Sequence, residues 1–560
     1  MPPQILHLPD GKKFTVTPVF GGMGFRSHDH NNLLHPFPIG WMTALHTEED
    51  RLEFDGYNDD GTPADGQGQS QSQSQSRSPK EVAIAIADRD ENVPSRTRRR
   101  TKPFARPTLQ NDTLFISSIS LPSDAEFKPA ASPTRQIAMM LWITLYWYFH
   151  QAPPDRELHT AASRDTPPGA KPVGEWKIRI RRDGVLRGRN LIPKLERMGL
   201  IASEDTAVGT SMDDSGDGWA NMFVSKRMFW QMPASLFLFT LQPVRHADLP
   251  ASPPATSRPG SPIREDAGRS ELLRQTYSHT PSLTPTGTGT LTPMGAHLAA
   301  DVPGSPMPTS VTAAPSFPVG PYFSSSHLPT YYPPPPPQYV CTHGTRHPLR
   351  PKPPRMGEVF YTRFIESMGQ YLSFRVASAS SSPVPYLGPV GPNPPEQGVS
   401  SMSDAQLLQS WFSNPRVGDF WGSYTSDFLE TALRSRHSFP VIGLWDGVPF
   451  GYFELYWVKE DILGRHVGSE VGEWDRGVHI MIGEEWSRGR VAAWLTSLVH
   501  YCFTGDPRTM SVCLEPRVDN QRVLRHLDAN GFSREKQVAF PHKQAWFVKL
   551  RREFWDGPAL

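Results

Sequence analysis

From Gly357 to the end of the chain, stretches that alternate polar and apolar residues follow stretches with the 3.6-residue spacing of helices. Two alternating stretches flank Asp446-Gly447, a dipeptide typical of a tight hairpin. The expected strands are residues 370–378, 440–444, 449–457, 478–482, 510–514, 533–540 and 545–550, and the expected helices are residues 404–421, 491–503 and 519–530. This order of elements predicts a mixed α/β domain over residues 357–560.

A second folded region is predicted over residues 1–57 and 105–248. Alternating stretches on both sides of Asp10-Gly11 predict a hairpin at its start. Ser132-Pro133 supplies an N-cap and a first-turn proline to a helix that continues to Tyr148. This helix is apolar nearly all round, so we expect it in the centre of a core. The remaining expected elements are strands at residues 112–121, 176–182 and 236–241 and a short helix at residues 189–198.

Three segments have compositions that predict no packed structure. Residues 61–102 contain a Gln-Ser repeat and a basic cluster, residues 250–356 are rich in proline, and residues 379–399 form a Ser/Pro/Gly loop. Proline lacks a backbone N–H and has a fixed φ, so neither helix nor sheet propagates through such segments. We therefore expect linkers at residues 61–102 and 250–356.

Composition narrows the class of protein. The 560-residue chain has 57 Lys+Arg against 56 Asp+Glu, so its net charge of +1 gives no support to a nucleic-acid binder. The longest apolar run, residues 139–149, is shorter than the ~18 residues that cross a bilayer, so no membrane association is expected. Three cysteines are too few for a disulfide framework and favour a reducing compartment. We therefore expect a cytoplasmic protein.

The strongest chemical signal is the turn that follows the expected strand at residues 478–482. This turn contains Gly483, Arg488, Gly489 and Arg490 and leads into a helix. The first N–H groups of a helix and the positive end of its dipole together bind phosphate groups. The turn therefore indicates a site for a diphosphate.

The order of elements and this turn resemble the GNAT acyl-CoA N-acyltransferases. Four segments resemble the siderophore-biosynthesis branch of that family, which includes the aerobactin-pathway hydroxylysine acetyltransferase and the fungal N5-hydroxyornithine acyltransferases. They are FGYFELYW (450–457), DRGVHIMIG (475–483), EPRVDN (515–520) and NGF (530–532). The resemblance implies a GNAT fold, an α+β mixed sheet, over residues 357–560. From the β-rich start and central helix of the N-terminal region, we expect a degenerate GNAT-like domain there.

The resemblance also implies a function. The chain is expected to use an acyl-CoA as co-substrate, to need no metal, and to acylate the hydroxylamine nitrogen of N5-hydroxy-L-ornithine. The product is a hydroxamate for siderophore biosynthesis. Acetyl-CoA is the favoured donor, and anhydromevalonyl-CoA, with a peroxisomal location, is the alternative. Hydroxylysine stays open as acceptor.

An alternative of a different class is a catalytically inactive GNAT-like scaffold whose proline-rich linker recruits siderophore-pathway proteins. The imperfect phosphate turn favours the scaffold, because Trp486 stands where the family has Gln or Arg. We expect Arg488 and Arg490 to compensate by contacting phosphate directly. Whether the chain forms a homodimer stays open.

His479 is the expected catalytic residue. Alternation along residues 478–482 places Val478, Ile480 and Ile482 on one side of the strand and His479 and Met481 on the other, facing the expected cleft. An imidazole in that position can hydrogen-bond the acceptor's hydroxyl group or take its proton.

The supporting acid is either Glu515 or Asp519, because Arg517 stands where bacterial relatives have an acid. Asp519 is equally suited to cap the helix that follows it. The resemblance implies that Asn520 contacts the CoA arm or the acyl carbonyl. These residues complete the expected catalytic and CoA-binding set.

The acceptor site is expected beside the strand at residues 449–457. Glu454 and Tyr456 share one face of this strand, where a carboxylate next to an aromatic wall can bind the acceptor's α-amino group. Trp457, on the other face, is a candidate with core packing as the alternative. Trp546 and Lys543 are further acceptor-site candidates.

Overall fold

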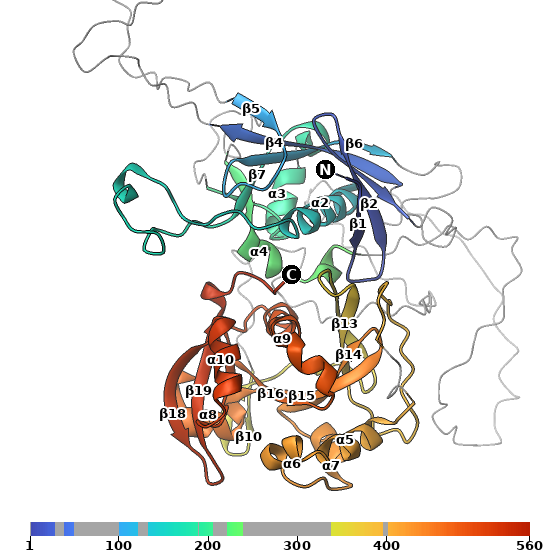
Figure 1. Cartoon of the computed structure of the whole chain (residues 1–560), viewed down its shortest axis with the longest axis vertical. Coiled ribbons are helices and arrows are strands. Elements are labelled where there is room, and N and C mark those ends of the chain that lie inside the picture. Colours follow the sequence, from blue (N-terminus) through green and yellow to red (C-terminus); the bar gives the residue numbers. More distant parts are fainter. Residues whose placement is uncertain are drawn as a thin grey trace, which may run out of the picture. The chain divides into compact units, whose positions relative to one another are not determined.

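The computed structural model describes residues 2–28, 39–49, 100–120, 133–188, 190–204, 221–238, 338–395 and 401–560. All of them lie in one compact unit, formed by Met1–Val244 and Thr312–Leu560. The strands of these residues form a nine-stranded N-terminal sheet, an eight-stranded C-terminal sheet and a separate two-stranded hairpin (Figure 1).

The C-terminal sheet has the strand order β12-β13-β14-β15-β16-β17-β19-β18. All neighbouring strands are antiparallel except β16 and β17, which are parallel. The strands are β12 (Val359–Ile365), β13 (Gln370–Val376), β14 (Ser438–Trp445), β15 (Val448–Trp457), β16 (Arg476–Ile482), β17 (Ser511–Leu514), β18 (Ser533–Ala539) and β19 (Gln544–Arg551). The β14–β15 turn has Asp446 and Gly447 at φ of 47° and 88°, as a tight hairpin requires.

Helices cover both faces of this sheet (Figure 1). Trp494 and Leu498 of α9 share a core cluster with Val478 of β16. On the other face, Leu408 of α5 shares a cluster with Met481 of β16. The helices are α5 (Asp404–Phe412), α6 (Pro415–Trp421), α7 (Phe428–Leu433), α8 (Ile462–Val467), α9 (Val491–Gly505) and α10 (Gln521–Ala529). The expected alternation of β16 is therefore confirmed, because Val478 and Met481 pack on opposite faces.

β16 and β17 pair only at their beginning. The parallel ladder consists of Arg476↔Val512 and Gly477↔Cys513, whereas β16 continues to Ile482. Among the described residues, the remainder of β16 has no strand neighbour on the β17 side. The sheet is thus split next to His479.

The N-terminal sheet repeats the topology of the C-terminal sheet. Its strand order is β1-β2-β3-β4-β6-β7-β9-β8, and β6 and β7 form its parallel pair. Helix α2 (Pro133–Phe149) connects β6 to β7 as α9 connects β16 to β17. The strands are β1 (Gln4–His7), β2 (Lys13–Val19), β3 (Gly22–Ser27), β4 (Gly40–Glu49), β5 (Arg100–Pro103), β6 (Asp112–Ser120), β7 (Lys177–Ile180), β8 (Ala202–Ser203) and β9 (Met222–Ser225), and the other helices are α3 (Leu191–Arg197) and α4 (Lys226–Trp230). The two sheets therefore have the same strand topology, and a degenerate GNAT-like domain at the N-terminus stays a prediction.

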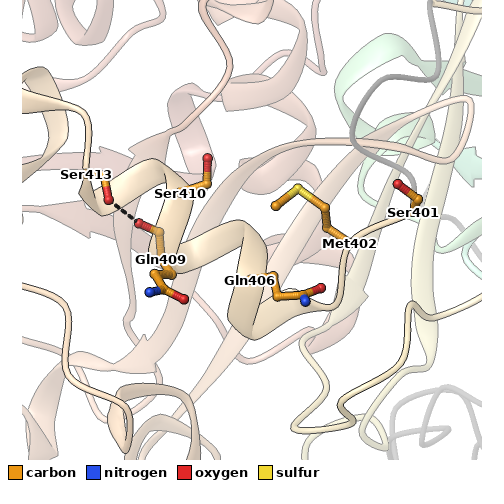
Figure 2. A pocket seen from close by; sticks show the side chains of 6 residues that line it. All are labelled: Ser401, Met402, Gln406, Gln409, Ser410 and Ser413. Atoms are coloured by element: carbon orange, nitrogen blue, oxygen red, sulfur yellow. Dashed lines mark hydrogen bonds between the residues drawn. The ribbon is translucent and has the colours of Figure 1, made fainter.

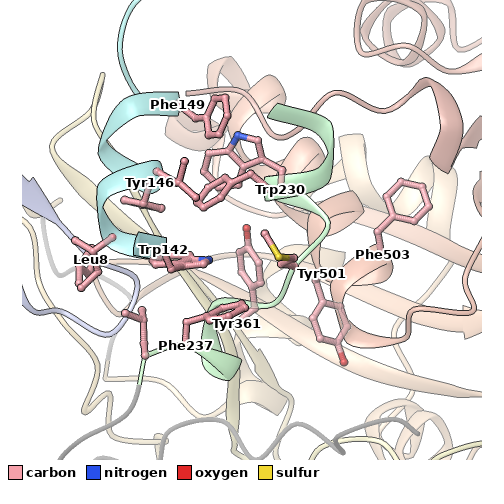
Figure 3. Close-up of a cluster of buried hydrophobic side chains, with 14 of the residues drawn as sticks. Leu8, Trp142, Tyr146, Phe149, Trp230, Phe237, Tyr361, Tyr501 and Phe503 are labelled. Carbon is pink, nitrogen blue, oxygen red and sulfur yellow. The ribbon is translucent and has the colours of Figure 1, made fainter. Parts of the chain in front are cut away.

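One apolar core joins side chains of both sheets' helices (Figure 3). α2 is buried on all sides from Gln136 to Phe149, as its uniformly apolar sequence predicts. The indole of Trp230 on α4 lies edge-on to the ring of His500 on α9, with 5.5 Å between ring centroids. The two sheets therefore share a core and do not fold around separate ones.

Several element boundaries differ from expectation. The helix expected at residues 404–421 is two helices, because Pro415 cannot continue α5 and instead starts α6 with Asn414 as its N-cap. Residues 359–365 form β12, a strand that the alternation pattern did not reveal because both of its faces are largely buried. Leu236 ends a 3₁₀ helix (Ala234–Leu236), where a strand was expected at residues 236–241.

The expected linker boundaries are also wrong in two places. Residues 339–348, inside the expected linker at 250–356, form the hairpin β10 (Tyr339–Thr342) and β11 (Thr345–Pro348). The hairpin is held to the domain through His347, whose Nδ1 lies 2.8 Å from Oε1 of the buried Glu460. Residues 100–102, at the end of the expected linker at 61–102, belong to β5, which pairs with β4. The rest of both expected linkers lies outside the described residues.

Candidate active site

His479 lies in the middle of β16, and its cross-strand partner on β15 is Glu454. The imidazole Nδ1 is 2.8 Å from Oε2 of Glu454. Tyr456 lies on the same face of β15, opposite Gly477, where a Cβ would come within 2.1 Å of the tyrosine ring. Glycine at 477 therefore makes room for Tyr456, whose ring centroid is 4.5 Å from that of His479.

Glu515 follows directly after β17 and reaches the other side of the imidazole. Its Oε1 is 2.7 Å from Nε2 of His479. Each carboxylate also accepts a tyrosine hydroxyl, with Tyr452 donating to Glu454 at 2.8 Å and Tyr456 donating to Glu515 at 2.7 Å. We call Glu454, His479 and Glu515 the Glu–His–Glu row.

The row carries separated charges. Burial alone would lower the pKa of His479, but the charge of Glu515 and hydrogen bonds to both carboxylates hold that pKa well above its usual value. Burial alone would raise the pKa of Glu515, but the charge and hydrogen bond of His479 lower it to about 2. Burial alone would also raise the pKa of Glu454, but the hydrogen bond and charge of His479 and the hydrogen bond of Tyr452 together lower it. His479 is thus an imidazolium that donates from both ring nitrogens to two carboxylates.

The imidazolium is the most exposed member of the row. Its side chain is 29% exposed, against 20% for Glu454 and 7% for Glu515. The indole of Trp421 stands edge-on to it at 6.3 Å between ring centroids. Nζ of Lys543 lies 3.6 Å from Oε1 of Glu515. An approaching molecule therefore meets an imidazole flanked by an aromatic wall and a lysine.

Asp519 lies outside the row. Its exposed carboxylate accepts a hydrogen bond from Nε of Arg517 at 3.0 Å. The expectation that Asp519 caps the following helix is wrong, because the N-cap of α10 is Asn520, whose Oδ1 accepts from the N–H of Val523 at 3.3 Å. Of the two expected acids, the structure brings only Glu515 to His479.

The expected diphosphate turn is a 3₁₀ helix, η8 (Glu485–Arg490), that continues directly into α9. The position of a Cβ on Gly489 has no atom within 4 Å, so the backbone here is open to a ligand. Arg488 is half-buried and donates to the carbonyl of Ile482 at 3.4 Å. Arg490 donates to Gln370 and lies 5.0 Å from the ring of Trp445, so its guanidinium already has partners.

Gly483 has a packing role. A Cβ at this position would lie 2.2 Å from the indole of Trp411, whose Nε1 donates to Glu484 at 2.8 Å. Only glycine allows Trp411 to cover the end of β16 so closely. The turn is thereby fixed to α5.

The structure does not bring two acceptor-site candidates to the row. Trp457 is 5% exposed and lies between the guanidinium groups of Arg350 and Arg476, at 4.5 and 4.1 Å from its ring. Trp546 packs against the main core beside Arg534, at 5.9 Å. In both cases the described contacts are with core and cations.

Sequence reasoning missed Tyr452 and Trp421 as residues of the site. Tyr452 stands two positions before Glu454 on the same strand face, so strand periodicity could have placed it there. Trp421 ends α6, and nothing in the sequence links that helix to β16. Its place beside His479 depends on the packing of α5–α7 over the sheet.

A shallow hollow of about 520 Å³ lies on α5 and the segment before it (Figure 2). Its lining side chains are Ser401, Met402, Gln406, Gln409, Ser410 and Ser413. These side chains carry no charge, and none belongs to the row. This hollow therefore offers no chemistry for the reaction.

Within the described residues, no helix combines the length and apolar character that a membrane crossing requires. The same part of the chain contains no group of three or more His, Cys, Asp or Glu side chains suited to hold a metal ion.

Comparison with known proteins defines the class to which this sheet and row belong. The family model described as "Acetyltransferase (GNAT) domain" matches residues 400–540. This match covers β14–β18, helices α5–α10, η8 and all three members of the row. The C-terminal sheet and its helices are therefore a GNAT acyltransferase domain, as expected.

The relatives define the family within this class. The chain is 56% identical over 551 residues to "N5-hydroxyornithine acetylase sidL" of Beauveria bassiana, covering 97% of this chain and 100% of the relative. It is 38% identical over 209 residues to "N(6)-hydroxylysine O-acetyltransferase" of Escherichia coli, covering 36% and 58%. It is 32% identical over 213 residues to "N(5)-hydroxyornithine:cis-anhydromevalonyl coenzyme A-N(5)-transacylase SIDF" of Beauveria bassiana, covering 37% and 42%. The chain belongs to the N5-hydroxyornithine acetylase family.

Proposed function

We propose that this protein transfers the acetyl group of acetyl-CoA to the hydroxylamine nitrogen of N5-hydroxy-L-ornithine, and that the resulting hydroxamate enters siderophore biosynthesis. The observation that carries the proposal is the Glu–His–Glu row at the point where β16 leaves β17. Similarity to an N5-hydroxyornithine acetylase along 97% of the chain supports the acceptor. The three free cysteines support a reducing compartment, and we propose the cytoplasm.

A difference between two relatives supports acetyl-CoA as the donor. The acetylase is 56% identical over almost the whole chain, whereas the anhydromevalonyl transacylase of the same organism is 32% identical over 37% of it. Similarity to the acetylase thus extends over almost the whole chain, whereas the transacylase match leaves out most of it. Both comparisons favour acetyl-CoA over the larger donor.

The row supplies the proton acceptor. A hydroxylamine nitrogen is largely neutral near pH 7 because the adjacent oxygen lowers its basicity, so attack needs no prior deprotonation. As the C–N bond forms and the C–S bond breaks, the attacking nitrogen becomes acidic and its proton passes to a carboxylate of the row. His479, already protonated, holds both carboxylates ionised and in place. The CoA thiolate leaves with the electron pair of the C–S bond.

Backbone donors of β16 serve the thioester carbonyl. Beyond Gly477 the edge of β16 that faces β17 has no ladder partner among the described residues. Its N–H groups can bind the negative charge that develops on the carbonyl oxygen. The split in the sheet thus provides charge stabilisation beside the row.

The turn before α9 holds the diphosphate of CoA. Gly489 allows the diphosphate to approach the backbone closely. Of the two arginines of the turn, Arg488 makes fewer contacts with other side chains, so its guanidinium can bind phosphate. Arg490 positions the turn through Gln370 and Trp445, and Gly483 through Trp411. Asn520 fixes the start of α10 and thereby the loop that carries Glu515.

The acceptor binds against Trp421, with Lys543 available to its α-carboxylate and Glu454 near its reacting end. Trp457 and Trp546 stay weaker candidates for this site because their described contacts lie elsewhere. This arrangement would select an amino acid with a free carboxylate.

The test is release of CoA thiol from acetyl-CoA and from anhydromevalonyl-CoA, each with N5-hydroxyornithine, ornithine and N6-hydroxylysine as acceptors. We expect the fastest release with acetyl-CoA and N5-hydroxyornithine. Equal rates with ornithine would contradict the argument from the neutral hydroxylamine. No release with any pair would favour the inactive scaffold.

A further inference from the structure

A cavity of about 270 Å³ lies at the end of the C-terminal sheet where β15 ends and β16 begins. Its floor includes Phe439, Trp457 and Arg476, and its wall includes Tyr501 of α9. The proline-rich segment 350–355, which follows the β10–β11 hairpin, forms another side. The volume is close to the lower end of the range for small-molecule sites, ~300 Å³. We call this cavity the β16-end cavity.

Arg476 is a buried cation without a carboxylate partner in the described part of the chain. It is 7% exposed, and its guanidinium lies 4.1 Å from the ring of Trp457 and 5.7 Å from that of Phe439. The thiol of Cys502 lines the same cavity. A buried charge is costly unless an opposite charge compensates it.

The charge of the neighbouring Arg350, in contrast, is compensated by a carboxylate. Arg350 donates to both carboxylate oxygens of Glu460, at 2.6 and 2.7 Å, and lies against the same Trp457 ring. Arg350 is therefore neutralised within the chain, whereas Arg476 is not. The difference leaves one uncompensated positive charge at the floor of the cavity.

The rim of the β16-end cavity adds to this charge. Lys352, Arg355 and Arg436 are exposed, and the described residues give none of them an ion pair. Of the acids that line the cavity, Asp506 is bonded by Nε and Nη2 of Arg508, at 2.8 and 2.6 Å. Glu358 accepts the backbone N–H of Arg355 at 3.0 Å. Cations thus outnumber the available acids.

The cavity is distinct from the candidate active site. Tyr501 and Gly505, near the end of α9, line it, whereas the diphosphate turn precedes the beginning of α9. The 15 residues of this helix separate the two by roughly 20 Å at ~1.5 Å per residue. Phe439 and Tyr501 also belong to the core cluster on the α9 face, whereas Met481 marks the face of the row.

We propose that the β16-end cavity binds a small organic anion through a phosphate or carboxylate group placed against Arg476. Lys352, Arg355 and Arg436 surround the charged group, and the aromatic and proline walls contact its apolar body. This site is independent of the proposed acetyl transfer. It lies on the strand that carries His479 three residues further on.

The test is calorimetric titration of the full-length protein, with its CoA site saturated by CoA, using inorganic phosphate, citrate and AMP separately. We expect saturable 1:1 binding of at least one probe, weakened by added salt. Arg476→Gln and, separately, Arg436→Gln should each raise the Kd by about tenfold or more, the usual effect of losing a charged hydrogen bond. Preference for AMP or phosphate over citrate would assign a phosphate ligand, and the reverse a carboxylate.

Arg434→Gln is the matched control, because Arg434 is two residues from Arg436 but pairs with Glu430 on the surface of α7 and does not line the cavity. It should leave the Kd unchanged. Absence of saturable binding of all three probes would overturn the proposal. So would binding that both Arg476→Gln and Arg436→Gln, each folded as judged by circular dichroism, leave unaltered.

Discussion

Ile116 occupies in the N-terminal sheet the position that His479 occupies in the C-terminal sheet. Each stands two residues after the last residue of β6 or β16 that pairs with the parallel strand, Leu114 or Gly477. The cross-strand partner of Ile116 is Thr43, and that of His479 is Glu454. Where one sheet has a charged pair, the other has an isoleucine and a threonine that are both fully buried.

In the N-terminal sheet, the chain that follows β7 occupies the space where β6 and β7 separate. A Cβ on Gly184, in the 3₁₀ helix Gly184–Arg187, would lie 2.2 Å from the carbonyl oxygen of Ile116. Leu186 of the same turn is fully buried. The chain after β7 therefore packs onto β6, whereas the chain after β17 leaves His479 partly exposed.

We predict that each chain binds one CoA. Among the described residues, the C-terminal sheet has an accessible Glu–His–Glu row, whereas the corresponding position of the N-terminal sheet is filled by Ile116 and Thr43, so we expect no second site there. Equilibrium titration with CoA should give a stoichiometry of 1. The variant His479→Ala should retain no acetyl transfer attributable to the other sheet, and a stoichiometry of 2 would contradict the filled split.

The Glu–His–Glu row should govern turnover. His479→Ala should lower kcat by at least ~100-fold, the low end for groups that act in proton transfer. Glu515→Gln should also lower kcat and cost about 1.5–3 kcal/mol in free energy of unfolding, because the imidazolium of His479 loses one of its two charged hydrogen bonds. Steady-state kinetics and urea unfolding check both effects.

Asp519→Asn is the matched control for Glu515→Gln. Asp519 is exposed and contacts Arg517, so its loss should change kcat by less than about twofold and leave the midpoint of urea unfolding nearly unchanged, as for surface ion pairs. A large loss of kcat in Asp519→Asn together with a small one in Glu515→Gln would reverse the assignment of the supporting acid.

The stability of the row should depend on pH in a defined direction. The pKa of His479 is raised in the folded state, so its contribution is complete below the unfolded pKa of about 6.5 and declines as the pH rises through the folded value. Glu515, with its pKa lowered to about 2, contributes constantly above the unfolded pKa of about 4.3. The difference in free energy of unfolding between wild type and His479→Gln should therefore shrink from pH 6 to pH 9. A difference that grows over this range would contradict an imidazolium in the row.

Two glycines of the turn should respond oppositely to the same substitution. Gly483→Ala should destabilise the fold by about 1–3 kcal/mol, because its Cβ meets the indole of Trp411. Gly489→Ala should leave stability within about 0.5 kcal/mol, since its Cβ points into open space, but should raise the KM for acetyl-CoA. Thermal unfolding and kinetics separate the two, and an unchanged KM in Gly489→Ala would remove Gly489 from the diphosphate site.

The sequence by itself determined the succession of strands from β13 to β19, the Asp446-Gly447 hairpin, the buried helix α2 and the face of β16 on which His479 lies. Each of these depends on local periodicity or on turn chemistry, which neighbouring residues fix. The family resemblance narrowed the supporting acid to Glu515 and Asp519, because Arg517 stands where bacterial relatives have an acid.

Only the tertiary structure decided between those two acids. The choice depends on where the pairing of β16 and β17 ends and on which side chain then contacts Nε2 of His479. Glu515 and His479 are 36 residues apart in sequence. The protonation of His479 is likewise a property of the assembled row, since an isolated histidine in a strand would titrate near its usual pKa. Long-range packing, which periodicity does not encode, sets both features.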